Sequence, residues 1–158
     1  MEDSGKNIGK PSFNESLTQA FSLAEKDWKQ YSPLTLAYLG DGVYELAVRT
    51  VYVKRMNCQA HKLNRLVVGH VSAKNQCRLV RTLLPMLSEE EYAVYKRGRN
   101  AKPASMAKNA STEEYLEATG FEALIGYLYL EERFDRMQEL IRCGFHEEET
   151  GAAVTDQK

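Results

Sequence analysis

Apolar residues recur at intervals of three and four along most of the chain, the spacing that places side chains on one face of an α-helix. The run from Val48 to Val53 is rich in β-branched residues, which are common in strands, but the length and period of the surrounding segment favour a helix. No strand or internal repeat competes with this pattern elsewhere in the sequence. The pattern therefore predicts an all-α fold.

The most apolar of the predicted helices covers 34–56. Ser32 and Pro33 supply its start signal, because serine can cap a helix and proline fits the first helical position. Its apolar positions fall on two sides of the helix, with Leu36, Leu39, Val43 and Leu46 on one and Ala37, Tyr44, Val48 and Val51 on the other. A helix that is apolar nearly all round must be covered by other helices or by a second subunit.

The remaining helices follow the same spacing, and capping or breaking residues separate them. They are predicted over 17–28, from beyond Asn57 to Val71, from the break at Ser72 to near Pro85, and over 88–96, 111–132 and 134–144. Ser88 to Glu91 and Ser111 to Glu114 have the spacing of capping boxes, and Gly144 suits the position just after a helix end. We expect three parts: a loose arm with a short amphipathic helix (1–31), one helical domain (32–146), and a disordered acidic tail (147–158).

Composition excludes several classes of protein but leaves the predicted fold unchanged. No apolar stretch is long enough to span a bilayer, and the polar residues after Met1 do not form a secretory signal, so we expect no membrane association and a cytoplasmic protein. Cys58, Cys77 and Cys143 have neither the number of a disulfide framework nor the spacing of a metal motif. A net charge of -1 argues against a generally basic nucleic-acid binder.

Positive charge is nevertheless concentrated in one tract, residues 96–109, which holds five basic residues and no acid. Gly98 and Pro103 interrupt regular structure there, so the sequence predicts a flexible basic loop. Such a loop is either an ordinary solvated segment or a source of contacts to phosphates.

Two acids stand among apolar neighbours, where an ionised carboxylate is costly without a partner. Asp41 is either the N-cap of a helix that begins at Gly42 or a functional carboxylate on a buried helix. Glu122 lies on a partly apolar face of the helix over 111–132, together with Thr119 and Ile125. It is either salt-bridged at the edge of the core or functional.

Two such carboxylates on separate helices can share one divalent cation. Mg²⁺ takes oxygen ligands and keeps several waters, so one or two carboxylates and a phosphate can complete its site. A cation held there can activate a water and neutralise charge on a scissile phosphate, while the basic tract contacts the backbone. The combination predicts a nuclease.

Two motifs carry a family resemblance. Tyr38-Leu39-Gly40-Asp41-Gly42-Val43 resembles the signature of the ribonuclease III family, and Phe121-Glu122-Ala123-Leu124-Ile125-Gly126 resembles its second motif. With Val71-Ser72-Ala73-Lys74 and the Arg-Gly-Arg-Asn-Ala-Lys sequence at 97–102, residues 33–145 are similar to the short bacterial form, Mini-ribonuclease III, which lacks a double-stranded RNA-binding domain. The resemblance implies an all-helical homodimer that holds double-stranded RNA in a groove at the subunit interface.

Carried over residue by residue, the resemblance implies that Asp41 and Glu122 are the catalytic, metal-binding carboxylates, with Mg²⁺ as the cofactor and Mn²⁺ as a substitute. It implies a stem of the large-subunit (23S) ribosomal RNA precursor as substrate, and a large-subunit ribosomal protein as a candidate partner. Contacts to the RNA backbone are expected from Lys74, Arg97, Arg99, Asn100, Lys102 and Lys108.

The sequence departs from the larger family at three acidic positions, which here hold Leu34, Ala37 and Thr119. Fewer anionic ligands predict weaker Mg²⁺ binding, completed by the bound RNA. The same departures keep open an alternative function, a non-catalytic double-stranded RNA-binding or ribosome-associated module on the same fold. Glu45, one turn after Asp41, is expected to assist through water, to form an ion pair or to lie at a dimer interface.

Five other residues are expected to have structural roles. His61 and His70 do not share a helix face at metal spacing, and Trp28 lies outside the resemblance, so we expect these three to serve packing. Gly40 and Gly42 are expected where a neighbouring helix or the partner subunit approaches the backbone.

Overall fold

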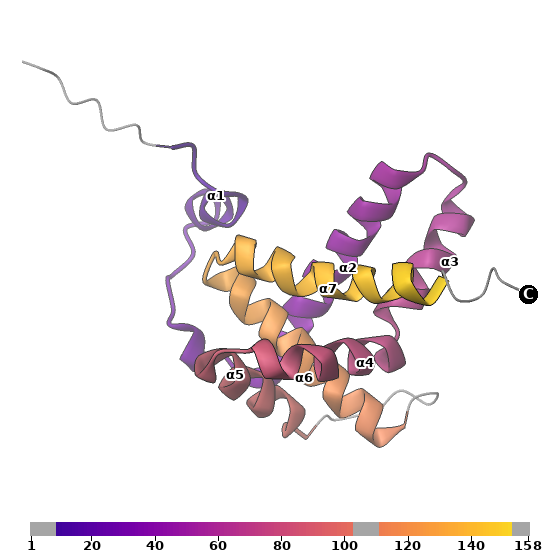
Figure 1. The fold of residues 1–158 in the computed structure, drawn as a ribbon. Helices are drawn as coiled ribbons and strands as arrows, with labels where there is room; N and C mark the ends of the chain where they lie inside the picture. The colour runs from indigo at the N-terminus through magenta and orange to yellow at the C-terminus, as the bar shows by residue number, and fades with distance from the viewer. Residues whose placement is uncertain (1–8, 103–110, 153–158) are drawn as a thin grey trace, which may run out of the picture.

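The computed structural model describes residues 9–102 and 111–152, with side chains described as far as residue 145. Within these ranges the chain forms the following helices (Figure 1): α1 (Phe13–Ala20), the 3₁₀ turn η1 (Trp28–Gln30), α2 (Pro33–Arg55), α3 (Ala60–Val71), α4 (Ala73–Leu83), the 3₁₀ turn η2 (Leu84–Met86), α5 (Glu89–Arg99), α6 (Thr112–Leu130) and α7 (Phe134–Ala152). The predicted all-α fold is confirmed. Over the described ranges, no helix combines the length and the apolar character that crossing a membrane would require.

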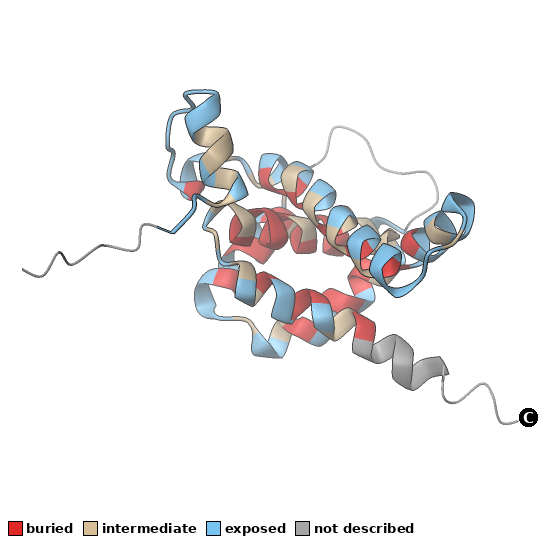
Figure 2. Ribbon diagram, turned by 90° about the horizontal axis from the view of Figure 1, so that it is seen from above, coloured by how far each residue is buried: buried red, intermediate tan, exposed pale blue. Residues whose placement is uncertain are grey.

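Helix α6 is the centre of the fold, and α2, α4, α5 and α7 pack against it (Figure 1). Every residue from Glu117 to Leu128 is buried except Glu122, which is half-buried. Buried residues gather around this helix, whereas α1 buries none of its residues (Figure 2). A helix enclosed on all sides has no solvent face on which a charge is cheap, so each acid on α6 needs a specific reason.

The predicted capping signals begin the helices as expected. Ser32 accepts the amide of Thr35 at the start of α2, and Pro33 takes the first helical position. Ser88 and Glu91 form a complete capping box at α5. At α6 only one half of the predicted capping box forms, in which the Ser111 side chain accepts the amide of Glu114.

The N-terminal helix lies earlier than predicted. Instead of covering 17–28, α1 begins after Ser12, whose side chain forms a capping box with Glu15. The helix ends before Ser22, which has a positive φ of 49°. The predicted packing of Trp28 on the core is confirmed, because its ring meets that of Tyr127 edge-on at 4.8 Å between centroids.

Two helices run further than predicted, and glycine packing explains both. α5 continues through Gly98, where an added Cβ would lie 2.7 Å from the Cβ of Ala123, so the tract begins as helix rather than loop. α7 passes through Gly144, which lies against Leu79, so the prediction of a helix end there is wrong. The rest of the basic tract (103–110), the end of the predicted tail (153–158) and the start of the arm (1–8) lie outside the described residues.

The expected structural roles of the cysteines and of His70 are confirmed. All three cysteines are free, and Cys77 is buried. His70 is buried, with its Nε2 atom 2.5 Å from the hydroxyl of Tyr52 and its ring stacked on Phe145 at 4.4 Å. His61 lies exposed on α3.

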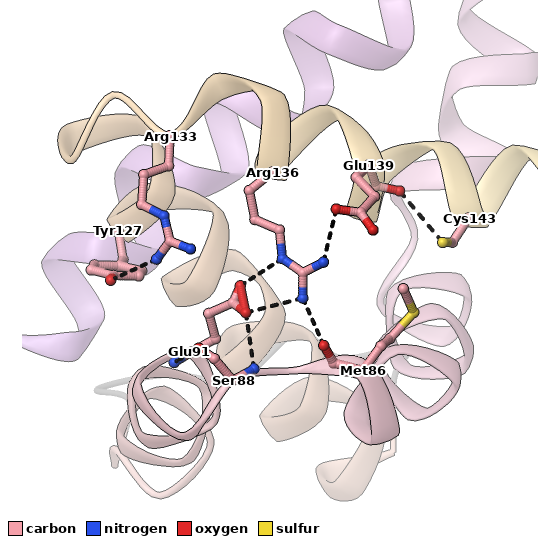
Figure 3. A network of polar contacts seen from close by, with 8 residues as sticks. All are labelled: Met86, Ser88, Glu91, Tyr127, Arg133, Arg136, Glu139 and Cys143. Atoms are coloured by element: carbon pink, nitrogen blue, oxygen red, sulfur yellow. Dashed lines mark hydrogen bonds and ion pairs between the residues drawn. The ribbon is translucent and has the colours of Figure 1, made fainter.

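A buried ion pair fastens α7 to α5 (Figure 3). The Arg136 guanidinium donates to both carboxylate oxygens of Glu91, at 2.9 and 3.0 Å, and to the carbonyl oxygen of Met86 at 2.7 Å. The backbone N–H of Ser88 donates to the same carboxylate. Burial by itself raises the pKa of Glu91, but the hydrogen bonds from Arg136 and Ser88 outweigh it and hold that pKa below its ordinary value. Glu91 therefore stays ionised inside the fold.

Helices α2 and α6 touch backbone to backbone at two glycines. An added Cβ at Gly40 would lie 1.7 Å from the carbonyl oxygen of Glu122, and one at Gly126 would lie 2.1 Å from that of Leu36. The expectation of a close neighbouring helix is confirmed at Gly40. At Gly42 no described atom lies within 4 Å of an added Cβ, so the neighbouring-helix expectation is wrong there.

This contrast gives a test of the helix contact. Gly40→Ala should lower the free energy of unfolding by at least ~2 kcal/mol, because the new methyl group can be fitted only by separating α2 from α6. Gly69→Ala on α3 is the matched control: like Gly42, Gly69 has no described atom within 4 Å of an added Cβ, and the change should raise the free energy of unfolding by about 0.5–1 kcal/mol, since alanine favours an uncrowded helix. Urea unfolding of both variants measures the difference, and equal stabilities would contradict the packing described.

Candidate active site

Asp41 lies in the middle of α2, which runs without interruption from Pro33 to Arg55. The N-cap interpretation of Asp41 is therefore wrong, since the helix begins nine residues earlier at the Ser32 cap. The residue is exposed on the outer side of the helix, directly after Gly40. Its carboxylate stands at the open edge of the α2–α6 contact.

Glu122 enters the same place from α6. Its own carbonyl oxygen is the atom that Gly40 approaches, so the α2–α6 crossing fixes the backbones of Asp41 and Glu122 side by side. Glu122 is half-buried, and no arginine or lysine among the described residues forms an ion pair with it. The salt-bridged interpretation of Glu122 therefore has no partner in the described part of the chain.

The charge of Asp41 acts on Glu122. Burial, with the nearby charge of Asp41, raises the pKa of Glu122 to about 8, and a hydrogen bond from Gln76 offsets part of that rise. Asp41 is exposed as a whole residue, but partial burial of its carboxyl group, followed by the charge of Glu45, raises its pKa. Such shifts are the response of carboxylates that lack a cation, and a bound divalent cation would reverse them.

Glu45 forms an ion pair one turn further along α2. Its Oε1 atom accepts from Nη2 and Nε of Arg49 at 2.6 and 3.1 Å. Of the three expected roles for Glu45, this geometry is that of the ion pair. Its charge still acts on Asp41, whose pKa it raises.

Sequence reasoning missed Gln76 of α4, which is 1% exposed. Its side-chain amide hydrogen-bonds the Glu122 carboxylate and donates to the carbonyl oxygen of Val71 at 3.0 Å. Its Oε1 atom is buried without a hydrogen-bond partner among the described residues. The available signal was a glutamine in the otherwise apolar stripe of Cys77, Val80 and Leu83, two residues after Lys74.

The acidic positions that the larger family fills do not contribute ligands here. Thr119 is buried, and its hydroxyl donates to the carbonyl oxygen of Tyr115 in its own helix at 2.9 Å. Ala37 is buried and Leu34 is partly exposed. Across residues 9–102 and 111–152, no three His, Cys, Asp or Glu side chains gather where a metal ion could bind. The site therefore offers two carboxylates and a buried amide.

The expected RNA-binding residues differ in how free their side chains are. Lys74, Asn100 and Lys102 are exposed. Arg97 is exposed but leans over the Trp28 ring at 5.9 Å. Lys108 lies outside the described residues.

Arg99 is anchored rather than loose. Its Nε atom donates to Oε1 of Glu117 at 2.8 Å, and the Tyr95 hydroxyl donates to the other oxygen of that buried carboxylate. The hydrogen bond and charge of Glu117 raise the pKa of Arg99 further. This pairing holds the end of α5 against α6, and part of the Arg99 side chain remains exposed.

The chain is similar to known proteins over the region that contains both acids. The ribonuclease III domain family matches residues 34–133. A Mini-ribonuclease 3 of Enterococcus faecalis is 46% identical over 118 residues, which are 73% of this chain and 89% of that protein. A Mini-ribonuclease 3 of Clostridium tetani is 44% identical over 119 residues, covering 75% of this chain and 79% of that protein.

The fold is similar as well. A crystal structure of a protein from Fusobacterium nucleatum superposes with a TM-score of 0.72 at 33% identity, covering 78% of this chain and 99% of that one. The ribonuclease III domain match over residues 34–133 includes α2 and α6, which position Asp41 and Glu122. From the domain match and from relatives with more than 40% identity, we conclude that this chain belongs to the ribonuclease III family, in the group of Mini-ribonuclease 3 enzymes.

Proposed function

We propose that this endoribonuclease cuts double-stranded RNA with Mg²⁺ held by Asp41 and Glu122. The observation that carries the proposal is the α2–α6 contact at Gly40, which places two carboxylates together without a cationic partner among the described residues. Ribonucleases III generally depend on a divalent metal. A metal ion held by two acids beside a phosphate substrate is suited to hydrolysis by an activated water.

The residues present fit a hard divalent cation. Carboxylate and amide oxygens are the ligands that Mg²⁺ and Mn²⁺ accept, and Gln76 keeps a buried oxygen without a partner in the described chain. Positive charge between Asp41 and Glu122 would remove the repulsion that raises the pKa of Glu122. With so few protein ligands, phosphate oxygens of the RNA complete the coordination.

Exposed polar and basic residues on α4 and at the end of α5 would supply the phosphate contacts. Lys74, Asn100 and Lys102 present exposed side chains, and Arg99 is held in place by Glu117. Contacts from Arg97 and from Lys108, the latter outside the described residues, belong to the same proposal. Such contacts recognise the shape of an RNA duplex rather than its bases.

We further propose that the duplex is a stem of the large-subunit (23S) ribosomal RNA precursor, cut in the cytoplasm, with a large-subunit ribosomal protein as candidate partner. The similarity to Mini-ribonuclease 3 enzymes supports this choice. The competing function, a non-catalytic RNA-binding module, would need the two carboxylates to be dispensable. Neither acid forms an ion pair with a described residue, and this favours catalysis.

A homodimer is proposed from the outer face of α2. Large apolar side chains lie exposed there: Leu34 (36%), Tyr38 (85%), Leu46 (66%) and Val53 (58%). Beside them, α2 and α7 form an apolar groove of about 610 Å³, lined by Val43, Leu46, Met137 and Ile141 among others. An apolar stripe and groove of this kind suit a second copy of the chain. Asp41 borders the stripe, so each site would face the subunit interface.

Removing either carboxylate tests the catalytic proposal. Asp41→Asn and Glu122→Gln should each lower the cleavage rate of an RNA duplex in Mg²⁺ about 10³-fold, because a catalytic metal contributes several kcal/mol to transition-state stabilisation. Asp135→Asn and Glu131→Gln replace exposed acids on α7 and after α6, and should cleave like the parent. Parent-like cleavage by Asp41→Asn would instead favour the non-catalytic alternative.

The raised pKa of Glu122 predicts opposite pH trends for stability and metal binding. In metal-free buffer the parent should lose stability as pH rises from about 4.5 towards 8, because the folded state holds the proton that the unfolded state releases. Glu122→Gln should therefore unfold at a higher temperature than the parent at pH 9, but not at pH 5. Mg²⁺ affinity of the parent should fall roughly tenfold per pH unit below about 8, since the metal must displace that proton.

Thermal unfolding in a chelator and calorimetric Mg²⁺ titration measure these trends. Glu131→Gln, which changes an exposed acid, serves as the control. A stability gain in Glu122→Gln that is equal at both pH values would contradict the assigned pKa.

Charge on the α2 stripe tests the dimer. Tyr38→Glu should weaken self-association at least ~100-fold, because a buried charge without a partner is costly at an interface. Tyr92→Glu changes an exposed tyrosine on α5 and should leave association unchanged. Sedimentation velocity over a range of concentrations measures both, and a parent that stays monomeric would refute the dimer.

A further inference from the structure

We propose that Gln76 is a further member of the metal site: it positions the Glu122 carboxylate through its side-chain amide nitrogen and offers its Oε1 atom to the water shell of the metal. The inference rests on the proposed function for the presence of the metal. It assigns a role to a residue on α4, an element that supplies neither of the two carboxylates.

Burial makes Gln76 an unusual residue for a helix core. It is 1% exposed in a stripe of apolar side chains on α4, next to the buried Cys77 and near Leu79 and Val80. Burying an amide costs free energy that only hydrogen bonds recover. A leucine of similar size would fill the space without that cost, so packing alone does not explain a glutamine.

The orientation of the amide is fixed by its neighbours. The carbonyl oxygen of Val71 can only accept, so the group 3.0 Å from it must be the Nε2 amine of Gln76. The hydrogen bond between Gln76 and Glu122 lowers the pKa of that carboxyl group, as a donated hydrogen bond does, so the amine faces Glu122 as well. Flipping the amide would place oxygen against oxygen at both contacts. The Oε1 atom therefore faces neither the Val71 carbonyl oxygen nor the Glu122 carboxylate.

That oxygen has no donor among the described residues. A buried carbonyl oxygen needs an N–H, an O–H or a cation, and the residues around Glu122 provide none. Waters bound to a divalent metal are strong donors, and Mg²⁺ retains several of them. In the metal-loaded protein a metal-bound water would supply the donor that Oε1 needs, beside the carboxylate that the amine of the same side chain positions.

A neutral oxygen also suits the charge of this site. The α2–α6 contact fixes two acids, Asp41 and Glu122, side by side, and a third carboxylate would add to their repulsion without metal. Thr119 directs its hydroxyl to Tyr115 in its own helix, so it does not serve the site. An amide supplies both a donor for the carboxylate and an acceptor for water at no cost in charge.

Mn²⁺ binding and metal-free stability together separate this role from a structural one. Gln76→Leu should weaken Mn²⁺ binding about 10- to 100-fold, as loss of a group that supports metal ligands does, while its melting temperature in a chelator stays equal to or above that of the parent. The Mg²⁺ concentration for half-maximal duplex cleavage should rise by the same factor, and saturating Mg²⁺ should restore most of the rate. Gln19→Leu, an exposed change on α1, is the matched control.

The outcomes distinguish this inference from the proposed function. Parent-like Mn²⁺ affinity in Gln76→Leu, or a lower metal-free melting temperature with unchanged affinity, would overturn the role of Gln76 while duplex cleavage by the parent still stood. If the parent bound Mn²⁺ through Gln76 but cleaved no duplex, only the proposed function would fall. Gln76→Met repeats the test with an unbranched side chain, and failure of both variants to fold would assign Gln76 to the core instead.

Discussion

The contact of α2 with α6 at Gly40 and Gly126 is the constraint on which the rest of the structure depends. Two helices meet there at main-chain distance, with no space for a Cβ at either glycine. Because α6 is enclosed by α2, α4, α5 and α7, this crossing lies at the centre of the core. The same crossing brings Asp41 of α2 close to Glu122 of α6. The stability of the fold and the chemistry of the proposed site therefore depend on the same helix contact.

Among the described residues, the buried Glu91 and Glu117 and the half-buried Glu122 have different partners, which divide them by role. Glu91 meets Arg136, and Glu117 meets Arg99 and Tyr95, so each has a guanidinium that stabilises its charge. Glu122 has instead the nearby charge of Asp41 and one amide hydrogen bond, from Gln76. A carboxylate kept in the interior without a cation is costly, and the proposed metal removes that cost only when the enzyme is loaded.

The outer face of α2 links this site to the proposed assembly and substrate. Asp41 lies about one turn after the exposed Tyr38 on α2, so the proposed metal site and the proposed dimer face share a helix. Arg99 reaches from the end of α5, fixed by Glu117 of the same central helix that carries Glu122. One rigid helix thus supports both the acid that would hold the metal and the base that would hold the phosphate.

The sequence by itself determined the helical class and most helix starts, and it marked Asp41 and Glu122 as candidate site residues, because periodicity, capping residues and an acid in an apolar run are local signals. Only the tertiary structure decided where α5 and α7 end, since Gly98 and Gly144 stop a helix in isolation but allow close packing here. It also decided that Asp41 is no cap, that Arg99 is tied to Glu117, and that Gln76 lies against Glu122. Each of these depends on residues distant in the chain, whose contacts no local pattern encodes.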